Sequence, residues 1–163
     1  MDQEKTFLAA VRENRDKMFR IAMSLLHAPA DAEDAVSSAV ESTWKHLHAI
    51  RNPEAVSAYL VRSTINAAKS ELRRRKPGVP IESVEHMLVS DGEKDPLFEY
   101  ICGLDDKLRL PLILRMQERM TEQEIAAALR IPRGTVSTRI NRALKILKEQ
   151  MTKEDMDCAV QCC

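Results

Sequence analysis

Apolar residues recur at spacings of three and four along most of the chain, and this periodicity constrains the fold more than any other feature. Such spacing places side chains on one face of an α-helix, whereas a half-buried strand needs alternation at two. The pattern is interrupted mainly at proline and glycine. A chain of 163 residues suits one domain or two small ones. We therefore predict an all-α protein made of two small helical domains.

Three amphipathic helices are predicted in the first half. The first covers residues 4–26, the second begins at Asp31 as its cap, and the third covers roughly 55–76. Trp44 is expected in the core, because one large ring can anchor a small bundle. The expected buried faces are Phe7, Val11, Met18, Ile21, Ala22 and Leu25; Val36, Val40, Thr43, Trp44 and Leu47; and Val61, Ile65, Ala68 and Leu72.

The third helix also carries a polar stripe that keeps step with its apolar face. The stripe contains no acidic residue and consists of Arg62, Asn66, Lys69, Arg73 and Lys76. A run of charges is usually a solvated face, but a stripe of this length is also suited to contact phosphates. Both interpretations of the stripe stay open on these residues alone.

The segment Met120–Leu147 predicts a helix-turn-helix, the arrangement that places side chains in a DNA major groove. Thr121 and Glu124 have the spacing of a capping box, and Pro132 suits the start of a second helix. The expected buried face of that helix is Val136, Ile140, Ala143, Leu144 and Leu147, which leaves Ser137, Thr138, Asn141, Arg142 and Lys145 on another face. A helical hairpin that does not bind DNA is the alternative, but hydroxyl, amide and guanidinium groups suit bases and phosphates.

The formal net charge of zero hides a strong segregation of charge. Residues 1–76 hold 13 Lys and Arg against 10 Asp and Glu, and residues 101–153 hold 11 against 6. Residues 77–100 hold 1 against 6, and residues 154–163 hold none against 3. We predict a first domain over 1–76, an acidic linker over 77–96, a second domain over 97–151 and a tail over 152–163.

No signal peptide or membrane span is visible, so we expect a cytoplasmic protein without membrane insertion. The tail holds Cys158, Cys162 and Cys163, whose spacing fits no common zinc pattern, and we expect it to be disordered. A thiol-based metal or redox sensor is the alternative for this segment. The scattered histidines and the lack of a phosphate-binding glycine loop indicate no catalytic site, and we expect no cofactor or metal.

Five segments taken in order resemble a bacterial sigma factor of the sigma-70 family, in the extracytoplasmic-function (ECF) group. In the first domain they are RDKMFRIAMSLL, DAEDAVSSAVESTWKHL and AYLVRSTINAAKSELRRRK. In the second they are LDDKLRLPLILRMQERMTEQEIAAAL and IPRGTVSTRINRALKIL. The resemblance covers about residues 5–150 and implies a transcription initiation factor. A polymerase-independent helix-turn-helix regulator is the alternative.

The resemblance implies a site for each partner. Asp31, Asp34, Ser38 and Glu41 would contact the clamp helices of the largest subunit of core RNA polymerase, and the flap of the second-largest subunit is a further expected contact. Arg51, Asn52, Arg62, Asn66, Lys69 and Arg73 would bind the −10 element of promoter DNA. Thr135, Ser137, Thr138, Asn141, Arg142 and Lys145 would bind the −35 element, with Arg115, Arg133 and Arg139 at its phosphates. An anti-sigma factor is a further candidate partner.

Several residues depart from the pattern of the family. Ser70 stands where an Asp is frequent, Ser137 where a Lys or Arg is frequent, and Arg119 where the family has Gly. Pro111 lies inside the first expected helix of region 4, which should start late or kink there. These departures bear on promoter sequence and not on the class of protein.

Overall fold

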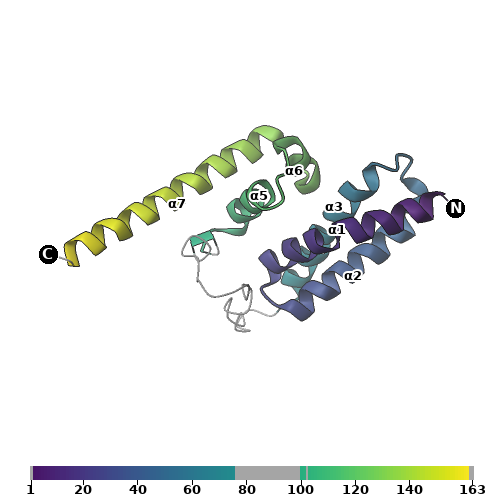
Figure 1. Ribbon diagram of the computed structural model, residues 1–163, viewed down its shortest axis with the longest axis horizontal. Coiled ribbons are helices and arrows are strands. Elements are labelled where there is room, and N and C mark those ends of the chain that lie inside the picture. The colour runs from purple at the N-terminus through teal and green to yellow at the C-terminus, as the bar shows by residue number, and fades with distance from the viewer. Residues whose placement is uncertain (1, 76–99, 102, 162–163) are drawn as a thin grey trace. The chain divides into compact units, whose positions relative to one another are not determined.

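The computed structural model describes residues 2–75, 100–101 and 103–161, and in these ranges the ordered elements are helical (Figure 1). The chain divides into two compact units, which confirms the prediction of two small helical domains. The predicted linker over 77–96 lies outside the described residues. None of the helices in the described ranges is long and apolar enough to cross a membrane.

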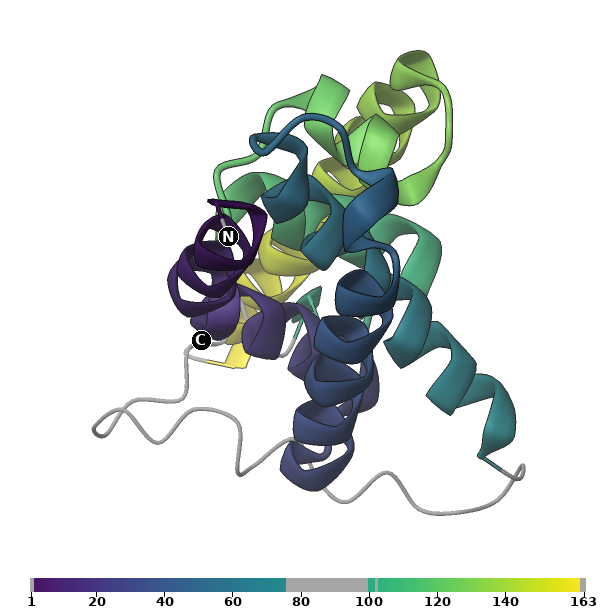
Figure 2. The same cartoon turned by 90° about the vertical axis from the view of Figure 1, so that its right-hand side faces the viewer.

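The first unit is a bundle of three helices with one 3₁₀ turn. It consists of α1 (Asp2–Leu26), α2 (Pro29–Lys45), η1 (Leu47–Ala49) and α3 (Ala55–Arg74), and the three α-helices contact one another (Figure 2). Met18 and Leu60 lie fully buried in its core with Phe7 near them. The apolar periodicity of the first and third helices therefore predicted the buried faces well.

The second helix buries the expected face only in part: Thr43 and Leu47 are buried as predicted, and Val36 and Val40 lie half-buried against the core. Its buried residues are Ala32, Ala35, Ala39 and Thr43, whereas Trp44 is 46% exposed and stacks at a tilt on Phe7, with 5.2 Å between the ring centroids. The prediction that Trp44 lies in the core is wrong. Small side chains let α2 approach its neighbours closely, and the large ring is displaced to the rim.

The corner between α1 and α2 is held by the end of α3. The guanidinium of Arg75 donates to the carbonyl oxygen of Leu26 at 2.8 Å and forms an ion pair with Asp31. The prediction that Asp31 caps α2 is wrong, because the helix begins two residues earlier, at Pro29, after Ala28 in the cap position. Asp31 instead lies in the first turn, where a carboxylate suits the helix dipole.

The second unit contains α5 (Asp106–Met116), most of α6 (Glu122–Leu129) and α7 (Arg133–Gln161). Helix α5 packs against α7, and Leu112, Leu114, Ile125 and Val136 are fully buried. Leu144 was predicted on the buried face of α7, but it is 44% exposed. Of the two alternatives at Pro111, the late start is wrong, because α5 begins five residues before this proline, and the kink stays a prediction.

Three helix ends are followed by a non-glycine residue with positive φ. They are His27 (φ 53°) after α1, Arg119 (φ 51°) after α5 and Arg130 (φ 54°) after α6. The left-handed region costs a side chain about 1–2 kcal/mol, which is why glycine is usual there. The turns on both sides of α6 are therefore built on arginines where glycine would be more stable.

Helix α7 is longer than the sequence pattern predicted. It continues through Gln161, so the expectation of a disordered tail is wrong over residues 152–161. No proline or glycine follows Gly134, so nothing in the sequence ends the helix earlier. Cys162 and Cys163 lie outside the described residues.

Candidate nucleic-acid interface

The polar residues predicted on α7 share the accessible side of its first half. Thr138, Asn141, Arg142 and Lys145 are exposed, and Thr135, Ser137 and Arg139 are half-buried beside them. The Thr138 hydroxyl donates to the carbonyl oxygen of Gly134 at 2.9 Å, so its lone pairs stay available as acceptors. This face offers amide, hydroxyl and guanidinium groups in one row, which are the groups that read base edges.

The start of α6 is fixed by the capping box that the sequence predicted. The backbone N–H of Glu124 donates to the Thr121 hydroxyl at 3.2 Å, and the Thr121 N–H donates to the Glu124 carboxylate at 2.7 Å. These reciprocal bonds satisfy two N–H groups that a helix of eight residues otherwise leaves to water. The first helix of the pair is therefore held in place ahead of α7.

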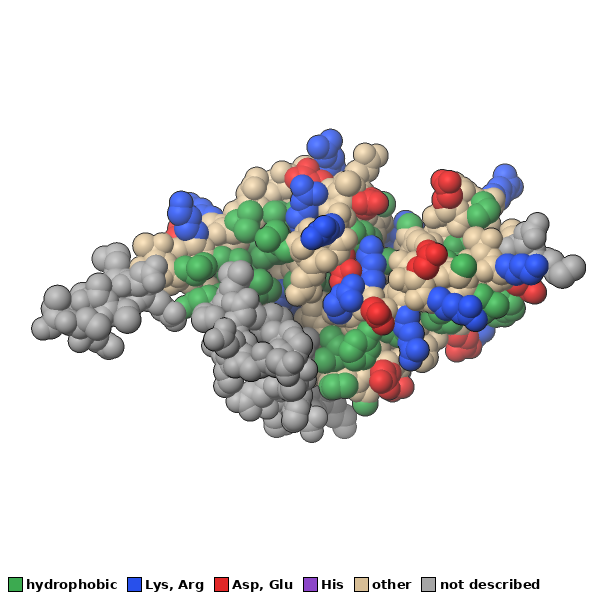
Figure 3. All heavy atoms as spheres, viewed as in Figure 1, with side chains coloured by type: hydrophobic (Ala, Val, Ile, Leu, Met, Phe, Trp, Pro, Cys, Tyr) green, Lys and Arg blue, Asp and Glu red, His purple; other side chains and the backbone are tan. Residues whose placement is uncertain are grey.

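Two of the arginines predicted at phosphates also bond within the unit. Arg115 donates to the carbonyl oxygen of Met120 at 3.2 Å and so bridges the turn before α6. Arg133 lies 3.3 Å from the carboxylate of Glu122 and remains 72% exposed. Figure 3 shows Lys and Arg side chains over α6 and the first turns of α7, with carboxylates among them. Each guanidinium has five donors, so one protein partner leaves others available.

The polar stripe on α3 is exposed along most of its length. Asn66, Lys69 and Arg73 are exposed, and the guanidinium of Arg73 stays close to its own helix, at 3.3 Å from the carbonyl oxygen of Lys69. Arg62 is half-buried, and its Nε is covered and has no acceptor within the described ranges. Lys76 lies outside the described residues. The stripe remains a basic surface that starts half-buried and opens toward the end of α3.

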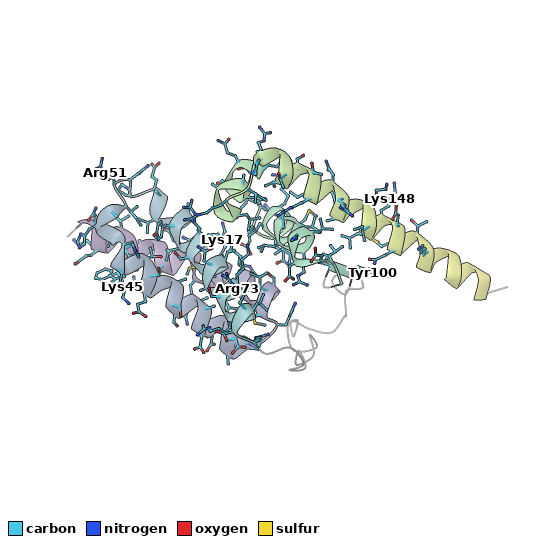
Figure 4. All side chains as sticks on the ribbon, turned by 180° about the vertical axis from the view of Figure 1, so that it is seen from behind. Lys17, Lys45, Arg51, Arg73, Tyr100 and Lys148 are labelled. Carbon is cyan, nitrogen blue, oxygen red and sulfur yellow. The ribbon has the colours of Figure 1, made fainter. Side chains whose placement is uncertain are left out.

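The loop before α3 presents Arg51 and Asn52 differently. Arg51 is exposed on this loop, and Arg73 lies near the opposite end of α3 (Figure 4). The side-chain oxygen of Asn52 accepts the N–H of Glu54 at 3.0 Å, which shapes the loop and leaves the amide NH₂ for other partners. His46 and Tyr59 flank the loop with ring centroids 6.3 Å apart. This ring pair could not be predicted from the sequence, because its members are 13 residues apart.

The four residues predicted at the polymerase follow one stripe of α2. Asp34 and Ser38 are exposed, whereas Asp31 is engaged by Arg75. The Lys45 Nζ lies 2.6 Å from the Glu41 Oε1. The hydrogen bond from Lys45 is the larger cause and its positive charge the smaller cause of a lowered pKa of the Glu41 carboxyl. Trp44 extends this stripe as an exposed aromatic ring, and sequence reasoning missed it by assigning the ring to the core.

The arrangement is suited to binding and carries no constellation for catalysis in the described ranges. No group of three or more His, Cys, Asp or Glu side chains there could hold a metal ion. The side chain of Cys158 is not among those described. Basic surfaces occur in both units, with an amide group on α3 and with amide and hydroxyl groups on α7, and such groups are suited to contact nucleic acid.

Two family models match the chain, one for each unit. The model described as Sigma-70 region 2 matches residues 10–77, and the model described as Sigma-70, region 4 matches residues 95–147. The first match contains the α3 stripe and the preceding loop. The second contains α5, α6 and the polar face of α7, and it ends before the last turns of that helix.

Curated relatives and solved structures cover nearly the whole chain. The RNA polymerase sigma-E factor of Streptomyces coelicolor is 31% identical, covering 96% of this chain and 92% of the relative. The sigma factor SigV of Bacillus subtilis is 27% identical, covering 91% and 93%. The sigma factor RpoE, solved with the anti-sigma factor NepR from Bartonella quintana, has a TM-score of 0.74 at 23% identity, covering 93% of this chain and 97% of that one. CnrH, solved with the cytosolic domain of CnrY, has a TM-score of 0.70 at 21% identity, covering 92% and 90%.

Proposed function

The chain belongs to the sigma-70 family of RNA polymerase sigma factors, and from this premise we propose that its two helical units divide promoter recognition between them. As an ECF sigma factor it binds core RNA polymerase and directs promoter-specific transcription initiation. The observation that carries the division is that each unit has its own basic, hydroxyl- or amide-bearing helix face. The first unit would serve the −10 element, and the second the −35 element.

In the second unit, α7 is the proposed reading helix for the −35 element. Ser137, Thr138, Asn141 and Arg142 would face bases in the major groove. Thr135, Lys145 and the guanidinium groups of Arg115, Arg133 and Arg139 would support them, mostly at phosphates. The exposure of Thr138, Asn141 and Arg142 favours this assignment, because base edges are reached only by side chains that leave the helix surface.

In the first unit, α3 and the loop before it would hold the −10 element. Arg62, Asn66, Lys69 and Arg73 form a stripe that follows the backbone of one strand. Arg51 and the NH₂ group of Asn52, which has no partner among the described residues, would capture an unpaired base, since a loop that Asn52 itself shapes offers donors in fixed positions. Strand opening would then draw on binding energy for the flipped base.

Polymerase binding would use the exposed stripe of α2. Asp34, Ser38 and Glu41 would meet the clamp helices of the largest subunit, and Trp44 would add the aromatic anchor that dominates many interfaces. Asp31 would contribute less, because Arg75 holds it within the unit. The second unit would reach the flap of the second-largest subunit.

The remaining assignments follow from this role. The protein would act in the cytoplasm with the polymerase and would supply binding energy and no catalytic group, so we propose that it is not an enzyme. An anti-sigma factor is a proposed partner, because the structurally similar sigma factor RpoE was solved with the anti-sigma factor NepR. No observation favours the polymerase-independent regulator.

Photo-crosslinking tests whether the first unit contacts the −10 element and the second unit the −35 element. A photoreactive residue would replace Asn141 on α7 or Asn66 on α3, and the chain would be assembled with core polymerase on a promoter fragment recovered by transcription. We expect crosslinks from position 141 near −35 and from position 66 near −10, with none from the control at Glu13, which is exposed on α1. Crosslinks from both positions to one element would contradict the proposal.

A further inference from the structure

The two turns that enclose α6 have the same unusual construction. Arg119 precedes the helix and Arg130 follows it, and both have positive φ, at 51° and 54°. Glycine is favoured in this conformation, because in any other residue the Cβ atom crowds the backbone. Arginine therefore carries a steric penalty at both positions. Each turn is closed by backbone bonds, from the N–H of Met120 to Leu114 and from the N–H of Ile131 to Ala126, which glycine would preserve.

Neither side chain contributes to the fold in a way that offsets this penalty. Both arginines are exposed, and within the described ranges neither guanidinium forms a hydrogen bond or an ion pair. A cation near a helix C-terminus does gain from the helix dipole. That gain is equally available one turn earlier, where Arg115 already stands in α5. The fold therefore gives no reason for arginine at these two positions.

Their placement supplies a reason. In a helix-turn-helix the second helix enters the major groove while the first crosses the sugar-phosphate backbone. Here α6 is the first helix, and at each of its ends stands an exposed guanidinium that has no partner among the described residues. We propose that Arg119 and Arg130 bind DNA phosphates on either side of α6, adding sequence-independent affinity to the reading by α7. This inference rests on the proposed function of the second unit.

The conformation of the two residues makes a sharp test possible. Substitution of Arg119 or Arg130 by glycine removes the cation and relieves the backbone, so DNA binding and stability should move in opposite directions. Binding of the full chain to a labelled 30-base-pair duplex of arbitrary sequence would be followed by fluorescence anisotropy over a range of KCl concentrations. Arg119→Lys and Arg130→Lys keep the charge, and Arg12→Gln removes an exposed arginine from the first unit.

For each glycine variant we expect the slope of log K against log salt to become shallower by about 0.9, the value for one phosphate contact, with about twice that change in the double variant. The thermal unfolding midpoint should rise by a few degrees. The lysine variants and Arg12→Gln should keep the slope of the wild-type chain. An unchanged slope of log K against log salt in the glycine variants would overturn the inference. This holds even for a glycine variant that binds core polymerase more weakly.

This test is separable from the test of the proposed function. If the chain initiates promoter-selective transcription but the glycine variants keep the wild-type salt slope, the phosphate contacts are contradicted and the proposed function is not. A chain that never initiates with core polymerase, but whose glycine variants show the shallower slope, would remove the proposed role and keep the phosphate contacts.

Discussion

At the scale of single residues, Arg142 is the proposed base-reading arginine of α7. It is exposed on α7, and within the described ranges it has no hydrogen-bonding or ionic partner, whereas Arg133 is shared with Glu122. A guanidinium of this kind can donate two parallel bonds to one guanine edge. Specificity at the −35 element should therefore depend on Arg142 more than on the arginines at the helix start.

Arg142→Ala should weaken holoenzyme binding to the cognate −35 sequence by about 1–3 kcal/mol and binding to a scrambled sequence by much less. Competition between the two DNA fragments measures the difference directly. Lys148→Ala, at another exposed position of α7, is the matched control and should change neither. An equal loss on both fragments would identify Arg142 as a phosphate contact.

Trp44 is the second residue whose exposure suggests a partner. Its ring is 46% exposed at the end of the α2 stripe and packs at a tilt against Phe7. Exposed tryptophans on a helix face are common anchors of protein interfaces, and alanine at such a site costs about 2 kcal/mol or more of binding.

We therefore expect Trp44→Ala to weaken binding to core polymerase at least tenfold and to lower stability only modestly, as titration and urea unfolding would show. Trp44→Phe keeps a ring beside Phe7 and should retain most of the affinity. Loss of stability without loss of polymerase affinity would return Trp44 to a purely structural role.

At the scale of elements, the corner between α1 and α2 depends on the end of α3. Arg75 is largely covered and joins the Leu26 carbonyl oxygen to Asp31, so one side chain links three helices. Within the described ranges, its neighbour Arg74 forms one exposed pair, with Glu71 2.5 Å away on the same helix. Adjacent members of one arginine run therefore have different roles.

Arg75→Met should lower the free energy of unfolding by about 1–2 kcal/mol, because it leaves a carbonyl oxygen and a carboxylate without their donor. Arg74→Met, the matched control, should cost less than about 0.5 kcal/mol, as is usual for exposed pairs. Urea unfolding of the full chain measures both. Equal effects would show that the corner does not depend on Arg75.

The sequence predicted which segments are helical better than it predicted how those helices face. Apolarity alone placed Val36, Val40 and Trp44 inside, but the two valines are only half-buried, Trp44 is exposed, and the smaller Ala35 and Ala39 are the buried residues of α2. Side-chain size at a helix contact depends on the partner helix, which periodicity cannot reveal. The capping box of Thr121 and Glu124 was predictable because it is local, whereas the Arg75–Asp31 pair spans 44 residues and was not.

At the scale of the whole molecule, a neutral chain presents basic helix faces in both of its units. The family matches fall on these units separately, which agrees with a factor that touches DNA at two places. The candidate DNA residues on α7 could be predicted from sequence because they lie at helical spacing on a polar face. The loop geometry at Asn52 and the positive φ angles of the two arginines around α6 could not be predicted, since both depend on backbone torsions.

The central claim is that this chain gives core RNA polymerase its promoter selectivity. The most direct measurement mixes the purified full chain with bacterial core polymerase, follows co-elution, and then sequences the transcripts made from genomic fragments. We predict a stable complex and initiation at a defined set of promoters that core polymerase alone does not use. Failure to associate at micromolar concentration, together with tight binding of the chain alone to duplex DNA, would contradict the account.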